Sequence, residues 1–394
     1  MRITGPVAYI LLYVALYAAF GVASPFWPKF FETKGLAPEQ IGMLLAAAML
    51  MRLASGPSVA FLADFIGTLR FLLASCAALA AAAAAALIWA HTFLVLLLIA
   101  LAQAAALAPT TSIADALSVN VAKPRVAGRQ FEYGWIRGSA SAAFILGTLG
   151  VGQFISSADF SAIIWMNAGL LIAAAGATAL LPGVADWAAR HRAARSSVPE
   201  VGSLLAIPPF RTVILVSALV YGSHAMHDAF AVIRWTEAGI SPAVISFLWS
   251  EAVIAEVFVF LLIGPAFLDR WGPRGAAVLA AGAGIVRWCV AGLTTSALVL
   301  ALIQPLHGVT FALLHLACMR IMGNLIPRSA AATAQAFYAF GSGLVTVALT
   351  FLSGILYASH PGAAFFPMAA LCAVALPLAW VGLANTRDHT ISAT

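Results

Sequence analysis

Apolar residues fill most of the chain in long runs, and short polar segments that often contain glycine or proline separate these runs. Residues 77–87, for example, are nearly all alanine and leucine and show no alternation between apolar and polar positions. A membrane-spanning helix needs about 20 consecutive apolar residues, whereas the strands of a membrane barrel alternate apolar and polar side chains. The pattern therefore predicts an all-α polytopic membrane protein.

Twelve runs reach this length when helix tilt is allowed for. One long polar segment, residues 183–207, divides them into six and six. The sequence thus predicts an N-terminal six-helix bundle (1–182), a cytoplasmic linker (183–207) and a C-terminal six-helix bundle (208–394). We expect the twelve transmembrane helices at residues 5–31, 40–66, 70–90, 93–121, 127–157, 161–182, 208–236, 242–269, 274–293, 296–323, 329–358 and 363–385.

The two predicted halves resemble each other in sequence. Three matches occur in the same order at nearly one offset: residues 35–38 with 239–242, 64–67 with 269–272, and Pro124-Arg125 with Pro327-Arg328. A parallel repeat of this kind is typical of secondary transporters. In such proteins two pseudo-symmetric bundles bind a solute between them, near the middle of the membrane.

Composition and charge distribution agree with this interpretation. Of the 394 residues, 63% are hydrophobic and only 9% are charged, which excludes an ordinary soluble domain. The predicted cytoplasmic loops carry 13 lysines and arginines, whereas the outer loops carry only Lys29, Lys34 and Arg234. This asymmetry predicts a multi-pass protein of the bacterial inner membrane with both termini in the cytoplasm. It also explains the net charge of +6 without any role in nucleic-acid binding.

Ionisable residues inside the predicted spans are the candidate functional groups, because such residues are costly in a membrane and rarely face lipid. Glu256 lies 13 residues before Asp269, and Arg287 lies 13 residues after Arg274. At about 1.5 Å per residue, both lie about 20 Å from the inner loop on neighbouring antiparallel helices. Asp115 and Arg137 are placed similarly in the first half. Each half therefore offers a carboxylate–arginine pair, which either locks helices together or exchanges partners with a proton or a substrate.

A second candidate group lies at the start of the second half. His224, His227 and Asp228 share one helix face, because they are spaced at i, i+3 and i+4. They could line a solute site and relay protons, form a helix–helix contact, or hold a divalent metal. The four cysteines lack metal-ligand spacing, and no metal or other cofactor is predicted. Tyr133 and Trp249 add aromatic surface to the predicted substrate site.

These residues resemble the motifs of the major facilitator superfamily, and within it those of the proton symporters grouped around lactose permease. The similarity is strongest to the branch that contains 3-phenylpropionate transporters. The motifs are Tyr133-Gly134-x-x-Arg137, Ser223-His224, Leu248-Trp249, Ala255-Glu256, Arg287-Trp288 and Gln304-Pro305-Leu306-His307-Gly308-x-Thr310-Phe311. The resemblance implies conformational gating at Asp64, Gly67, Asp269, Arg270 and Gly272.

The resemblance also implies roles for single residues. Asp115 and Arg137 match substrate-binding residues, and Arg287 and His307 match the coupling network. The chain departs from the permease pattern at Thr310, where the permease has the glutamate that is protonated. The proton site must therefore lie elsewhere, with Asp228, Glu251 and Glu256 as candidates.

The favoured hypothesis is a monomeric secondary transporter that imports a small organic solute, such as an aromatic or other monocarboxylate, together with protons. Arginine suits such a substrate because its guanidinium forms paired hydrogen bonds with a carboxylate. The alternatives are a proton-driven efflux antiporter of hydrophobic compounds, a sugar or nucleoside symporter, and a membrane module that transports nothing. An enzyme is not expected, because no nucleophile, metal-hydrolase or nucleotide-binding motif occurs.

Overall fold

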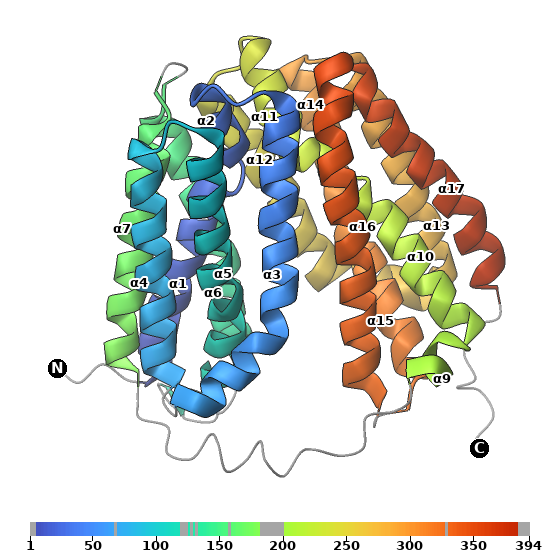
Figure 1. Ribbon diagram of the computed structural model, residues 1–394. Helices are drawn as coiled ribbons and strands as arrows, with labels where there is room; N and C mark the ends of the chain where they lie inside the picture. The colour runs from blue at the N-terminus through green and yellow to red at the C-terminus, as the bar shows by residue number, and fades with distance from the viewer. Residues whose placement is uncertain are drawn as a thin grey trace. The chain divides into compact units, whose positions relative to one another are not determined.

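The computed structural model of the protein describes residues 5–66, 69–118, 125–126, 129–130, 133–156, 159–181, 201–327 and 330–384 (Figure 1). The predicted gating residue Gly67 and most of the predicted linker, residues 183–200, lie outside the described residues. The side chains of Asp64 and Tyr133 also lie outside the description, although both residues belong to helices.

The first half of the chain is helical at all of its predicted spans. A separate short helix begins at Trp27, so the first predicted span is broken near residues 24–26. The fifth span begins at Tyr133 rather than at residue 127, because Arg129–Gln130 pairs with Arg125–Val126 as a two-residue antiparallel ladder. The helices are α1 (Gly5–Ala23), α2 (Trp27–Thr33), α3 (Pro38–Ile66), α4 (Leu69–Ala86), α5 (Phe93–Ser118), α6 (Tyr133–Phe154) and α7 (Ser161–Ala177), with 3-10 turns η1 (Leu87–Trp89) and η2 (Thr178–Leu180) and strands β1 (Arg125–Val126) and β2 (Arg129–Gln130).

The second half is more segmented than the sequence pattern predicts. The predicted spans at 208–236 and 296–323 each consist of two or more helical segments, and two segments are π-helical, a form often found at functional sites. The elements are α9 (Val201–Leu205), α10 (Pro208–Gly222), α11 (Ala225–Glu237), α12 (Pro242–Phe258), π segment η3 (Val259–Ile263), α13 (Gly264–Leu293), α14 (Ala297–Ile303), π segment η4 (Gly308–Leu313), α15 (Leu314–Leu325), α16 (Ala331–Ser359), 3-10 turn η6 (Ala363–Phe365) and α17 (Phe366–Gly382).

The described helices account for the twelve predicted spans. Among the described residues, nine stretches are long and apolar enough to cross a membrane, and α3 and α6 add two more helices of 29 and 22 residues. One of the nine, Pro242–Leu293, is 52 residues long and contains two spans. The chain turns between them at Gly272, whose φ of 71° breaks α13 next to Pro273. The predicted all-α polytopic fold is therefore confirmed.

The chain divides into two compact units, residues 1–195 with 239–247 and residues 196–238 with 248–394. Within the first unit, α1 packs against α6 and α7, α4 packs against α5 and α7, and α3 packs against α5. Within the second unit, α10 packs against α16 and α17, α13 packs against α15 and α17, and η3 packs against η4. Helices that correspond under the sequence repeat thus make corresponding contacts, as expected of two pseudo-symmetric bundles.

The turn glycines of the sequence repeat adopt the same backbone conformation in both halves. Gly35 has a φ of 83° and Gly239 a φ of 82°. Each follows a helix, α2 or α11, and precedes the proline that begins the next helix. A positive φ is strained for residues with a side chain beyond Cα, so glycine at both positions has a structural cause.

Each unit has its own apolar core. In the first unit, Leu12, Leu16 and Leu73 are among the fully buried residues of α1 and α4. In the second, Phe210 and Val220 on α10 pack in a cluster with Ala280 and Ala281 on α13. The short alanine side chains let these helices approach closely, as is usual between helices in membranes.

Candidate functional site

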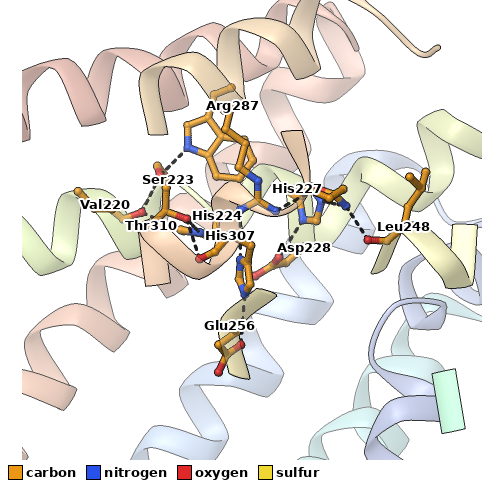
Figure 2. A network of polar contacts seen from close by, with 12 residues as sticks. Val220, Ser223, His224, His227, Asp228, Leu248, Glu256, Arg287, His307 and Thr310 are labelled. Atoms are coloured by element: carbon orange, nitrogen blue, oxygen red, sulfur yellow. Dashed lines mark hydrogen bonds and ion pairs between the residues drawn. The ribbon is translucent and has the colours of Figure 1, made fainter. Parts of the chain in front are cut away.

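The main polar cluster of the second unit is centred on Arg287 of α13, whose residue is only 1% exposed. Its Nη1 donates to Nδ1 of His307 at 3.1 Å, and its Nη2 donates to Oε1 of Gln304 at 3.2 Å. The guanidinium carbon lies 4.5 Å from the ring centroid of Trp288, a cation–π distance. The arginine therefore has two hydrogen-bonded neighbours, and a separate series of contacts continues from each of them to a carboxylate (Figure 2).

The first direction leads through His307 to Glu256. Because Nδ1 of His307 accepts a hydrogen bond from Arg287, the neutral ring carries its proton on Nε2. Nε2 lies 3.5 Å from Oε2 of Glu256, so the imidazole can donate to that carboxylate. The sequence prediction of a direct pair between Glu256 and Arg287 is thus wrong in one respect. The two residues are linked, but His307 lies between them (Figure 2).

Close contact between two helices brings His307 next to Glu256. Gly308 follows His307, and a Cβ atom built on it would lie 2.7 Å from the carbonyl oxygen of Ala255 and 3.0 Å from a methyl carbon of Val259. Only glycine lets the two backbones approach this closely. The π segments η3 and η4, which begin just after Glu256 and His307, pack against each other at the same place.

Replacing Gly308 with alanine should therefore separate these helices and lower the stability of the protein. Overpacking against a backbone oxygen typically costs about 1–3 kcal/mol. We expect a lower apparent melting temperature for the purified Gly308→Ala protein, measured by differential scanning fluorimetry. Gly282→Ala is the matched control, because a Cβ atom on Gly282 of α13 meets nothing within 4 Å. Equal melting temperatures for the two variants would contradict the close contact.

The second direction leads from Arg287 through Gln304 and His227 to Asp228. Nε2 of Gln304 lies 3.3 Å from the carbonyl oxygen of Leu248 and 3.4 Å from Nε2 of His227. Nδ1 of His227 lies 3.2 Å from Oδ1 of Asp228. The ring of His227 stacks on Trp249 with centroids 5.0 Å apart. The predicted substrate-site residues His227 and Trp249 are thus in direct contact, and His227 also contacts the predicted proton site Asp228.

The sequence predicts His224 on one helix face with His227 and Asp228, but His224 is the N-cap residue of α11, at the break between α10 and α11. Its Nδ1 lies 2.9 Å from the carbonyl oxygen of Val220, and its Nε2 lies 3.0 Å from Oγ1 of Thr310. Both ring nitrogens therefore have protein partners, as a helix–helix contact requires. Thr310, which replaces the permease glutamate, is the partner on the other side. Among the described residues, no group of three His, Cys, Asp or Glu side chains is arranged to hold a metal ion.

The carboxylate–arginine pair of the first unit is more open. Nη1 of Arg137 lies 4.0 Å from Oδ1 of Asp115, and the two side chains are 48% and 40% exposed. Tyr13 donates to Oδ1 of Asp115 at 2.5 Å, and Arg137 donates to the hydroxyl of Tyr17 at 2.7 Å. The guanidinium also lies over the Tyr17 ring, 5.5 Å from its centroid. The structure thus brings together the predicted pair and adds two tyrosines of α1.

The predicted gating residues of the second half lie around the break in α13. Asp269 accepts a hydrogen bond from Nη2 of Arg320 on α15 at 2.6 Å, so the two helices are bridged. The guanidinium of Arg270 lies over the neighbouring Trp271 ring, 5.8 Å from its centroid. Gly272 supplies the turn. The corresponding positions of the first half, Asp64 and Gly67, cannot be compared, because they fall outside the side-chain description.

Three important residues were absent from the predicted site. Gln304 is 1% exposed and connects Arg287 to His227, and Tyr13 and Tyr17 flank the first carboxylate–arginine pair. Gln304 carries a signal in the sequence, because an amide inside a membrane span needs hydrogen-bond partners. The two tyrosines carry none, because aromatic residues in an apolar helix are usually packing residues.

Comparisons with known proteins agree with this fold and extend over nearly the whole chain. The chain is 29% identical over 377 residues to a probable 3-phenylpropionic acid transporter of Escherichia coli strain K12, covering 93% of this chain and 94% of that protein. Among solved structures, the nucleoside transporter NupG has a TM-score of 0.79 at 16% identity and covers 98% of this chain and 100% of its own. A bacterial homologue of the human lysosomal transporter Spinster has a TM-score of 0.77 at 14% identity, with 96% of each chain covered.

The solved structures share too little sequence to indicate more than the fold. The match to a protein-family model is more specific, because it extends over residues 7–368 and so includes both units and the polar clusters of each. The chain is accordingly a membrane transporter of the major facilitator type, and it belongs to the MFS_1-like family.

Proposed function

We propose that the protein imports a small organic monocarboxylate together with protons, by alternating access. An aryl-substituted acid such as 3-phenylpropionate is the first substrate to test, because the similar Escherichia coli protein is a probable transporter of that acid. The distribution of lysine and arginine supports a location in the bacterial inner membrane with both termini in the cytoplasm.

The observation that carries the proposal is the chain of contacts from Glu256 through His307 to Arg287. A carboxylate and a guanidinium joined by a neutral imidazole inside membrane spans have no evident use as a static support, because buried ion pairs add little stability. Glu256 is 24% exposed, so a proton can reach it. A proton taken up there cancels the charge of a transported anion, and the two together cross the membrane without net charge.

Electroneutral movement has an energetic consequence. Each net charge that crosses the membrane changes the free energy by about 2.3 kcal/mol per 100 mV. An anion entering a cell that is negative inside would be opposed by this amount. Proton symport at 1:1 stoichiometry removes the opposition and lets the pH gradient drive uptake.

Arg137 is the better candidate for binding the substrate carboxylate, because its side chain is 48% exposed whereas Arg287 is 1% exposed. Its guanidinium lies over the ring of Tyr17, so an aryl group of the substrate would find aromatic surface beside its carboxylate. Asp115 balances the charge of Arg137 when no anion is bound. We assign His227 and Trp249 a supporting role, because they contact each other and the Arg287 cluster.

The ion pair between Asp269 and Arg320 suits a conformational role. Both side chains are accessible, at 68% and 36% exposed, so the pair can open and close at low cost. We propose that Asp269, Arg270 and Gly272 form a gating turn, as the resemblance to the superfamily implies. Asp64 and Gly67 are proposed to do the same in the first half.

Uptake into proteoliposomes tests the function. Purified protein is reconstituted, and entry of labelled 3-phenylpropionate is measured with the outside more acidic than the inside, with equal pH, and with the gradient reversed. We expect acceleration by the inward proton gradient and accumulation above equilibrium. Export driven by inward protons would instead support an efflux antiporter. No response of transport to either gradient would contradict proton coupling.

Replacing Arg137 with lysine should weaken substrate binding strongly. Lysine keeps the charge but loses the planar pair of donors that fits a carboxylate. A hydrogen bond to a charged group contributes about 1.5–3 kcal/mol, so we expect an affinity loss of roughly 10- to 150-fold. The measurement is binding of 3-phenylpropionate to purified protein by calorimetry. Tyr17→Phe is the control, because it removes the hydroxyl but keeps the ring beneath the guanidinium; unchanged affinity in Arg137→Lys would refute the role.

A further inference from the structure

Arg287 is connected to two carboxylates rather than to one. We call the six residues Arg287, Gln304, His307, His227, Asp228 and Glu256 the Arg287 network. One arm runs through His307 to Glu256 (Figure 2). The other arm runs through Gln304 and His227 to Asp228. All six residues belong to the second unit. The network is therefore a fork with a cation at its branch point and an acid at each end.

The hydrogen-bond directions make both imidazoles of the fork neutral. His307 accepts from Arg287 at Nδ1, and its Nε2 lies 3.5 Å from Oε2 of Glu256. His227 accepts from the amide of Gln304 at Nε2 and so carries its proton on Nδ1, where it donates to Asp228. A protonated imidazole at either position would direct an N–H group at another donor. The fork thus holds one positive charge and two acids.

One guanidinium balances only one carboxylate. An ionised second carboxylate in the same network would lack a counter-charge inside the membrane, which is costly. Three other arginines in the helices of this unit contact groups outside the fork. Arg320 pairs with Asp269, Arg274 lies over the ring of Trp380, and Arg234 donates to the carbonyl oxygens of Ala291 and Gly292. These contacts leave Arg287 as the cation that both acids of the fork share.

Among the other titratable groups on the elements packed around the fork, His224 has protein partners on both nitrogens. His315 contacts the rings of Phe260 and Tyr338, and in its protonated form it also interacts with Glu256. An imidazole is mostly neutral at neutral pH, and a neutral His315 adds no second positive charge to the fork. Glu251 lies on the same helix as Glu256, one and a half turns earlier, and adds a further acid. The phenols and thiols on these elements are uncharged at neutral pH: Tyr221, Tyr338, Tyr357, Cys289, Cys318 and Cys372.

We propose that Asp228 and Glu256 form one proton-sharing pair, coupled through Arg287, in which a single proton occupies one acid or the other near neutral pH. The pair deepens the proton site of the proposed function, on which it rests. The Asp228 side chain is 58% exposed and the Glu256 side chain is 24% exposed. The proton therefore has a more open and a less open position within one network.

Gln304 is the positioning residue of the pair. Its amide orients Arg287 through Oε1 and fixes the tautomer of His227 through Nε2. It reacts with neither proton nor substrate. Gln304→Leu has a similar volume but no polar atoms, so it should uncouple Asp228 from Arg287 without removing an acid.

Infrared titration of the purified protein tests the proposal. The carbonyl stretch of protonated carboxylic acids is followed from pH 4 to pH 9 in wild type and in Asp228→Asn, Glu256→Gln and the double variant. Strongly coupled acids titrate in two steps that belong to the pair, here separated by about one pH unit or more. In either single variant the neighbouring acid is permanently uncharged. Both single variants should therefore lose the upper step and keep only the lower one, and the double variant should lose both.

Independent acids would give a different result. Each single variant would then lose its own step, and one of the two would keep the upper step at its wild-type pH. That result, or the absence of both steps in wild type, would overturn the proposal. Glu251→Gln is the matched control on the same helix and should keep both steps. In Gln304→Leu the two steps should move closer together, which a purely structural role of Gln304 would not cause.

This titration requires neither a substrate nor transport. A protein that shows the coupled pair but no pH-driven uptake would contradict the proposed function while supporting the pair. Uptake driven by a pH gradient in a protein whose two acids titrate independently would support the proposed function and contradict the proton-sharing pair.

Discussion

Glu256→Gln should abolish proton-driven accumulation of the substrate while leaving exchange intact. Glutamine has nearly the same size and can still accept a hydrogen bond from His307, but it cannot take up a proton. A gradient of two pH units can support roughly 100-fold accumulation at 1:1 stoichiometry, because each unit corresponds to about 1.4 kcal/mol. In the variant we expect the substrate concentration inside the proteoliposomes to be about equal to that outside. The measurement is steady-state 3-phenylpropionate in proteoliposomes with an acidic exterior.

Exchange of labelled for unlabelled substrate at equal pH is the accompanying readout. It requires binding and alternating access but no net proton movement, so Glu256→Gln should retain it. Glu251→Gln serves as the control, because it removes an acid from the same helix without touching the link to His307. Wild-type accumulation in Glu256→Gln would show that the proton is carried elsewhere. Loss of exchange as well would indicate a structural rather than a coupling role.

The course of the chain through the membrane could be predicted well from the sequence, because a bilayer imposes one length on every span. The repeat was also visible, since Gly35 and Gly239 are required by the same turn in both halves. The breaks inside spans were less predictable. The π segments at 259–263 and 308–313 contain no proline and leave the apolar pattern unchanged. Gly264-Pro265 and Pro305 lie beside them, but such residues indicate a disturbed helix without specifying a π segment.

Depth within the membrane could be predicted for the polar residues, but direction around the helix axis could not. Counting residues placed Glu256 and Arg287 at matching depth, yet the structure inserts His307 between them. Counting assumes straight α-helices, whereas η3 lies between Glu256 and the inner end of its span. In the first half, where α5 and α6 carry no π segment, the predicted partners Asp115 and Arg137 do lie near each other.

The two carboxylate–arginine clusters differ in a way that the sequence repeat conceals. Arg137 is accessible and lies beside the hydroxyl and ring of Tyr17, which suits reversible binding of an anion. Arg287 is buried and connected to two acids, which suits the control of protonation. The two halves of a pseudo-symmetric fold can thus have different roles, and we propose substrate binding in the first half and proton coupling in the second.

Replacing Arg287 with alanine should have the largest effect on stability of any single change in the network. It removes the guanidinium that balances Glu256 and Asp228 and leaves His307 and Gln304 without their shared partner. Removing one member of a buried charged cluster typically costs about 3–5 kcal/mol. We expect a melting temperature several degrees lower than wild type and no uptake of 3-phenylpropionate.

Neutralising one of the two acids in the Arg287→Ala protein should restore part of the lost thermal stability. If uncompensated negative charge causes the damage, Arg287→Ala combined with Glu256→Gln or Asp228→Asn should melt at a higher temperature than Arg287→Ala alone. The extent of recovery in each double variant, read as a double-mutant cycle, measures how strongly each acid depends on the arginine. Arg287→Ala combined with Glu251→Gln is the control and should show no recovery. If the control recovers equally, or if Arg287→Ala melts like wild type, Arg287 does not balance the two acids of the fork.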